Sequence, residues 1–229
     1  MHYPESDNNF TTNIYEMPIK DKWYVFWGGT NEYSNYHYPY ENQRYAYDLV
    51  IVEDGSSYKK YSNENENFFA FNQEIVAPLE GKVIKVIDDV LDNNPGDVNE
   101  HEPLGNYIVI EHINNEYSLI AHLKQFSIDV EEGDMVVTGQ KLGLCGNSGN
   151  STEPHIHFQV MDAKNVMYAS SINIQFFEDS PVQGDYVYPK DYSRDQKSEK
   201  MDFTDKAEIA FSLPSIISSM YKIVGAFFK

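Results

Sequence analysis

The sequence predicts a mainly β protein, with an antiparallel β-sandwich or barrel-like domain and a C-terminal amphipathic helix. Short runs rich in β-branched and aromatic residues recur between residues 23 and 180, and turn-forming residues separate them. No segment in residues 21–180 keeps a 3.6-residue apolar period, whereas such a pattern is present near the C-terminus. Many short strands with regular turns and little helix are typical of an all-β sandwich or barrel.

The predicted strands begin with aromatic and aliphatic runs. Residues 23–29 (WYVFWGG) predict a buried strand that ends in a glycine turn, and residues 45–52 (YAYDLVIV) predict a core strand. Residues 53–66 are polar and predict a loop. Seven further strands are expected at residues 74–77, 81–90, 105–112, 116–123, 135–137, 141–144 and 155–160.

The chain divides into four parts by composition. Residues 1–22 are interpreted as a loosely ordered lead-in, 23–180 as the folded domain, 181–202 as a polar linker or surface strand, and 203–229 as an amphipathic helical tail. Apolar residues recur at helical spacing in 214–228, with serines and Lys222 between them. We expect this segment to pack on the domain or on a second copy, or to lie on a membrane surface where Lys222 and Lys229 meet anionic lipid.

Composition excludes some classes of protein. The chain has 229 residues and a formal net charge of −19, which argues against nucleic acid as a partner because like charges repel. Its one cysteine, Cys145, cannot form an intramolecular disulfide. No apolar run reaches the roughly 18 residues that a membrane span needs. The polar N-terminus shows no signal-peptide pattern, so a cytoplasmic location stays open.

The sharpest chemical signal is the pair His155 and His157 in the run HIHFQV. Residues i and i+2 of a strand point to the same face, so the two imidazoles are expected to share one space. One ring can then bind a metal while the other holds a water or an oxyanion. A glycine-rich turn precedes the pair, and its small residues would let a substrate backbone approach closely. A purely structural pair is the alternative.

Two other residues stand out against apolar neighbours. His122 lies in YSLIAHLK, where a histidine is either a catalytic group or a hydrogen-bonded core residue. Asp48 lies in YAYDLVIV, and a carboxylate in such a run is paired, hydrogen-bonded or bound to metal. His101, in an acidic loop, and His112, at a strand end, are interpreted as structural.

These pieces together resemble the lysostaphin/LytM family of zinc endopeptidases. The resemblance runs from about residue 46 to 160 through YAYD, APLEGKVIKV, GNYIVIEH, YSLIAHLKQ and the segment that ends in HIHF. It implies an antiparallel β-fold with a groove on one face and a single Zn²⁺ ion. By the same resemblance Asp48 and His157 are metal ligands, and His122 and His155 are catalytic.

One position departs from the family pattern. The family's first zinc ligand is a histidine four residues before the aspartate, and here that position is Arg44. A guanidinium is always protonated and cannot bind a metal. His37 lies eleven residues before Asp48, and a turn near Pro39 and Asn42 would bring it back beside that carboxylate. His37 is therefore the predicted third ligand, with a surface histidine as the alternative.

The resemblance implies a metallopeptidase, a hydrolase that cleaves peptide bonds in peptidoglycan stems or cross-bridges by metal-activated water. It also implies action in the cell envelope or outside the cell. The alternative is a catalytically degenerate domain that acts as a binding or scaffolding module in a cell-envelope assembly. Arg44 favours this alternative, whereas retention of Asp48, His122, His155 and His157 favours the enzyme.

Overall fold

The computed structural model describes residues 9–60, 62–177 and 180–192, and within them the chain forms twelve strands and two short 3-10 turns. The strands are β1 (Phe10–Tyr15), β2 (Trp23–Trp27), β3 (Tyr47–Val50), β4 (Glu74–Val76), β5 (Gly81–Ile87), β6 (Asn106–Glu111), β7 (Tyr117–Leu123), β8 (Met135–Val136), β9 (Lys141–Leu144), β10 (Ile156–Met161), β11 (Ser171–Phe176) and β12 (Tyr186–Val187).

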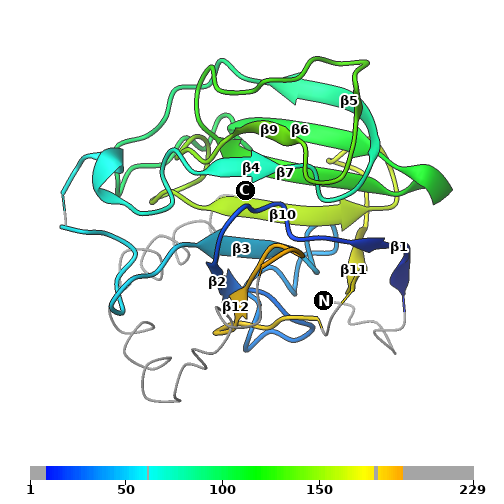
Figure 1. Cartoon of the computed structure of the whole chain (residues 1–229), viewed down its shortest axis with the longest axis horizontal. Helices are drawn as coiled ribbons and strands as arrows, with labels where there is room; N and C mark the ends of the chain where they lie inside the picture. The colour runs from blue at the N-terminus through cyan, green and yellow to red at the C-terminus, as the bar shows by residue number, and fades with distance from the viewer. Residues whose placement is uncertain (1–8, 61, 178–179, 193–229) are drawn as a thin grey trace.

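One large sheet dominates the described part of the chain. Its strands run in the order β12-β2-β3-β10-β7-β6-β5-β8, and β11 joins it through β10 while β1 pairs with β11. A second sheet consists of β4 and β9. Strand β10 lies in the middle of the large sheet, with β3 and β7 on either side (Figure 1). All pairings in the two sheets are antiparallel except that of β1 with β11, which confirms the predicted mainly antiparallel β-fold.

The core explains why the apolar runs form strands. Ile156, Phe158 and Val160 alternate along β10 and are fully buried in one cluster with Ile120 of β7 and Leu49 of β3. On the other face, His157 and Gln159 point toward polar partners. Because the side chains of a strand alternate between faces, the apolar residues of β10 pack the core while its polar residues line a separate surface.

Strands were predicted at nine places, and the structure has a strand at each of them, although most are shorter than expected. Three strands lie outside the predicted set. Strand β1 falls in the lead-in, β11 follows the predicted domain strands, and β12 falls in the segment expected to be a linker or surface strand. In β1 the exposed face carries the apolar residues Phe10 and Ile14, whereas the buried face carries Thr11, Asn13 and Tyr15. This is the reverse of the usual pattern, so the sequence did not predict the strand.

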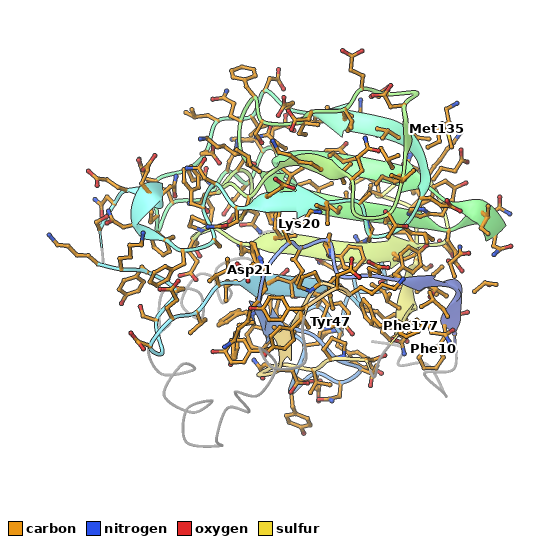
Figure 2. The ribbon with its side chains drawn as sticks, viewed as in Figure 1. Phe10, Lys20, Asp21, Tyr47, Met135 and Phe177 are labelled. Atoms are coloured by element: carbon orange, nitrogen blue, oxygen red, sulfur yellow. The ribbon has the colours of Figure 1, made fainter. Side chains whose placement is uncertain are left out.

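Strand β8 lies at one end of the large sheet, apart from the pair of β1 and β11. Figure 2 shows Met135, on β8, far from Phe10, the first residue of β1, and from Phe177, which directly follows β11. Among the described residues, no helix has the length and apolar character that a membrane crossing requires. The predicted amphipathic segment at 214–228 lies outside the described residues.

A buried carboxylate attaches β1 to the rest of the fold. Glu116 is only 4% exposed and accepts hydrogen bonds from the backbone amides of Thr12 and Asn13, from the Asn13 side chain and from the Tyr15 hydroxyl. These donors surround the carboxylate and compensate for its removal from water. Desolvation and the nearby Glu116 charge raise the pKa of Tyr15, so its hydroxyl stays protonated and donates.

We expect Glu116→Ala to lower the free energy of unfolding by roughly 2–4 kcal/mol, because several buried donors lose their acceptor together. Urea unfolding followed by circular dichroism measures the change. The exposed Glu131 provides a control, and Glu131→Ala should change stability by less than about 0.5 kcal/mol. Equal stabilities for the two variants would contradict the anchoring role of Glu116.

Candidate metal centre

Pairing of β3 with β10 sets the first two residues of the site. In this antiparallel ladder Asp48 lies directly opposite His157, so their side chains leave the sheet on the same face. The Asp48 Oδ1 and His157 Nδ1 atoms are 3.0 Å apart. Both residues are buried, at 7% and 5% exposure. The sheet itself therefore brings together two groups that are 109 residues apart in the sequence.

The third residue, His37, arrives from the loop between β2 and β3. Its Nε2 atom lies 2.8 Å from Asp48 Oδ2, and the side chain is buried. The loop is held by Asn35, which is fully buried and donates its amide to the carbonyls of Gly29 and Ala46. Asn35 Oδ1 in turn accepts the backbone amide of His37. This internal bracing fixes where the His37 ring enters the site.

Arg44 occupies the position where the family pattern has a histidine, and the structure places it in the same loop. Its Nε donates to the carbonyl of Tyr38 at 3.0 Å, and its guanidinium lies over the Tyr38 ring. Arg44 thus holds the loop segment that directly follows His37.

The geometry of His37, Asp48 and His157 suits a small divalent cation. One ligand atom from each residue lies within 4.8 Å of the other two, and all three side chains are buried. Two imidazole nitrogens and one carboxylate oxygen form a donor set typical of catalytic zinc, which keeps a fourth position for water or substrate. In addition, His157 Nε2 lies 2.9 Å from Gln159 Oε1, and metal-bound histidines usually donate their other ring N–H in this way.

His122 lies beside this group at the end of β7. Its backbone has φ 64°, a left-handed conformation that is uncommon for a residue other than glycine and that often occurs at functional sites. The ring Nδ1 donates to the carbonyl of Ser148 at 2.8 Å, so Nε2 is the unprotonated nitrogen of the neutral ring. The centroid of the His122 ring lies 6.0 Å from that of His157 and 4.7 Å from that of His155.

His155 is partly exposed and lies one residue before β10, not within it as the sequence predicted. Its Nδ1 lies 2.9 Å from the carbonyl of Glu153 and 3.0 Å from the Ser151 hydroxyl. Because a carbonyl only accepts, Nδ1 carries the proton and Nε2 is free to accept one. His122 and His155 therefore have the same tautomer, each held by a backbone carbonyl.

Burial and neighbouring charges shift the pKa values of four groups in the site, and not all in the same direction. Burial lowers the pKa of His122 and of His155, with the neighbouring histidines adding to the effect at His122, so both rings are neutral. At His157 the hydrogen bond and charge of Asp48 outweigh burial and raise the pKa. At Asp48 the histidine partners outweigh burial and hold the pKa well below its usual range. The site thus combines one ionised carboxylate with two neutral bases.

The glycine-rich turn before His155 packs against protein, which differs from the sequence interpretation that it admits a substrate backbone. A Cβ on Gly146 would lie 2.4 Å from backbone atoms of Lys124, and one on Gly149 would lie 2.4 Å from the amide of Gly105. Asn93, from the loop that follows β5, donates its side-chain amide to the carbonyls of Gly149 and Ser151. The glycines thus permit close packing of this loop on the turn that carries His155.

Sequence reasoning missed two buried polar residues near the site. Gln159 continues the His157 face of β10, and Glu153 contacts His155 through its carbonyl. The i+2 spacing from His157 is the signal that could have identified Gln159. The remaining described histidines lie elsewhere: His101 is exposed, and His112 is buried between Glu80 and Ser118.

A protein-family model matches the central part of the chain. The model of Peptidase family M23 matches residues 61–169, which include His122, His155 and His157, while His37 and Asp48 precede the match. Residues 61–169, which make up just under half of the chain, therefore match peptidase family M23, and this match confirms the resemblance to the lysostaphin/LytM type.

Two curated relatives come from Vibrio cholerae. Peptidoglycan DD-endopeptidase ShyA is 36% identical over 81 residues, which cover 35% of this chain and 18% of the relative. Peptidoglycan DD-endopeptidase ShyB is 30% identical over 137 residues, which cover 48% of this chain and 32% of the relative. The chain thus spans a third or less of the length of these relatives. A crystal structure of a zinc containing peptidase from Vibrio cholerae is 25% identical, covers 59% of this chain and 30% of that chain, and has a TM-score of 0.37.

Glu153 gives the site region a testable dependence on pH. The residue is 2% exposed, and burial raises its pKa to about 8, although the nearby Ser57 hydroxyl opposes the shift. Among the described residues its Oε1 has no hydrogen-bond partner. Between pH 4.5 and 8 the folded state keeps the Glu153 proton while the unfolded state loses it, so rising pH favours unfolding.

We expect Glu153→Gln to remove this dependence, because glutamine is neutral at every pH. The free energy of unfolding of the wild type should fall relative to the variant, by up to about 1.4 kcal/mol for each pH unit in that window. Urea unfolding of the metal-free proteins measures the difference at three pH values across this window, at about pH 5, 6.5 and 8. Parallel pH profiles for the two proteins would show that the pKa of Glu153 does not differ between the folded and unfolded states.

Proposed function

We propose that this protein is a zinc-dependent endopeptidase that hydrolyses peptide bonds in peptidoglycan stems or cross-bridges. The observation that carries the proposal is the cluster of His37, Asp48 and His157, whose ligand atoms lie within 4.8 Å of one another beside two neutral histidines. The match to peptidase family M23 supports peptide hydrolysis, and the similarity to the peptidoglycan DD-endopeptidases ShyA and ShyB supports peptidoglycan as the substrate. A cell-wall substrate places the action of the protein in the cell envelope or outside the cell.

His37, Asp48 and His157 would hold one Zn²⁺ ion, which supplies Lewis-acid chemistry and lowers the pKa of a bound water toward ~7. The carboxylate of Asp48 offsets part of the cation's charge and leaves a net positive site for a developing oxyanion. The burial of all three ligands limits the water that competes for the same position.

His122 and His155 carry the proton chemistry in this proposal. Each ring is neutral and presents an unprotonated Nε2, because its Nδ1–H is held by a carbonyl. A neutral imidazole accepts the proton of the attacking water and, once protonated, donates to the oxyanion or the leaving amine. The two rings lie 4.7 Å apart between centroids, so one can act on the water while the other contacts the oxyanion.

The first test concerns His37. We expect His37→Ala to weaken zinc binding by at least about tenfold, since the site keeps only two of the three protein ligands that catalytic zinc normally has. Metal content by mass spectrometry after dialysis, and competition with a chelator, measure the change. The exposed His101 provides a matched control, and His101→Ala should bind zinc like the wild type. Full zinc occupancy in His37→Ala would remove His37 from the site.

The second test separates metal binding from catalysis. We expect His122→Ala and His155→Ala to keep the metal and to lose activity by about 10²-fold or more, because each removes a group that transfers a proton. Release of soluble fragments from purified peptidoglycan, followed by mass spectrometry, measures the rate. Activity within a few-fold of wild type would contradict the catalytic assignment. A wild type that binds no zinc after reconstitution would favour the binding or scaffolding module.

A further inference from the structure

We infer that Gln159 is a positioning residue that fixes the orientation of His157 and links it to the loop that carries His37. The inference rests on the proposed zinc-dependent function. It arises from a chain of two hydrogen bonds: His157 Nε2 to Gln159 Oε1 at 2.9 Å, and Gln159 Nε2 to the carbonyl of Asn42 at 2.9 Å.

The direction of this chain follows from the chemistry of its far end. The Asn42 carbonyl only accepts, so the amide group of Gln159 must face it as the donor. The Gln159 carbonyl oxygen then faces His157, and His157 Nε2 must carry a proton to donate to it. Gln159 is 2% exposed, so water does not compete for either bond.

This arrangement decides which nitrogen of His157 can bind a metal. With Nε2 protonated, Nδ1 offers its lone pair on the side of the ring where Asp48 lies, 3.0 Å away. The other neutral tautomer would leave the Gln159 oxygen facing an unprotonated nitrogen deep in the protein. Such an unsatisfied contact is costly, so Gln159 holds His157 in the tautomer that can coordinate.

The orientation of the proposed ligands depends strongly on Gln159, because the His37 ring lacks a comparable hydrogen bond. Within the described part of the chain, the buried His37 Nδ1 has no hydrogen-bond partner. His122 and His155, in contrast, are each held by a backbone carbonyl. Each of the two histidine ligands in the proposed site has one ring nitrogen that does not face Asp48. Among the described residues, only that of His157 has a hydrogen-bond partner.

The second bond of the chain reaches the loop of His37. Asn42 lies five residues after His37 in the loop between β2 and β3, and its carbonyl accepts the Gln159 amide. Gln159 is therefore a side-chain contact between strand β10, which carries His157, and the loop that carries His37. Loss of the Gln159 side chain should loosen both ligands, one through its tautomer and the other through its loop.

The experiment compares two substitutions that break different halves of the chain. Gln159→Met has similar size but neither accepts nor donates strongly, so both bonds are lost. Gln159→Glu keeps an acceptor for His157 and loses the donor to Asn42. Ser118→Ala is the control, because it removes the buried partner of another histidine, His112, away from the site.

We expect zinc affinity, measured by chelator competition, to fall about 10- to 100-fold in Gln159→Met and to recover most of this loss in Gln159→Glu. Ser118→Ala should bind zinc like the wild type. The downfield proton NMR signal of His157 Nε2–H should be present in the wild type and in Gln159→Glu, and absent in Gln159→Met. Hydrogen exchange of residues 40–46 should rise in both Gln159 variants.

The outcomes separate this inference from the proposed function. If the wild type binds zinc and cleaves peptidoglycan but Gln159→Met has the same zinc affinity and the same His157 signal, the inference is wrong and the function stands. If Gln159→Glu binds zinc as weakly as Gln159→Met, acceptance from His157 is not the cause, and the inference is also wrong. If the wild type binds no zinc, the proposed function fails. The inference is then tested in the metal-free protein, where a His157 signal that Gln159→Met leaves unchanged overturns it. Circular dichroism checks that each variant is folded.

Discussion

The antiparallel pairing of β3 with β10 is the constraint on which the site depends. It sets Asp48 opposite His157, and the same pairing buries Leu49 and Ile156 in the core beneath them. A one-residue slip would turn Asp48 and His157 to the core face and expose apolar residues in their place. The stability of the core therefore enforces the register of the site. The other three histidines lie around this fixed pair on loops and strand ends: His37 between β2 and β3, His122 near the end of β7, and His155 directly before β10.

The buried carboxylate of Asp48 stays ionised only because several histidines lie beside it. Asp48 is buried, and burial alone would favour its protonated form, yet the two histidines that face it outweigh this effect. A buried anion is tolerated when charges or hydrogen bonds compensate for lost hydration. The same burial keeps His122 and His155 neutral. One buried environment thus yields an ionised carboxylate and two neutral bases, because Asp48 has a histidine nitrogen beside each of its oxygens.

Sequence patterns predicted the core strands because their apolar residues are contiguous or alternate, as in residues 45–52 and 81–90. They failed for β1, whose exposed Phe10 and Ile14 mask its alternation and whose inward Thr11 and Asn13 are satisfied by distant partners such as Glu116. Asp48 and His157 were identifiable because a charged group in an apolar run needs a partner. Gln159 was harder to identify, since an amide in a strand is common and its role depends on the Asn42 carbonyl, 117 residues away.

The exchange of a family histidine for Arg44 is compatible with a metal site because the loop between β2 and β3 supplies two different things. One is a ring nitrogen beside Asp48, and the other is a backbone conformation that holds this ring in place. His37 brings a ring nitrogen to within 2.8 Å of Asp48, and Arg44 braces the segment that follows His37 through the Tyr38 carbonyl. A strand position cannot be moved without a change of register, whereas a loop can deliver a side chain from another point if its backbone bonds are satisfied. Asn35 satisfies them here by bonding to both ends of the loop, at Gly29 and Ala46. In the proposed site, the ligands on strands therefore keep their places in the family pattern, and the proposed ligand on the loop is the one that differs.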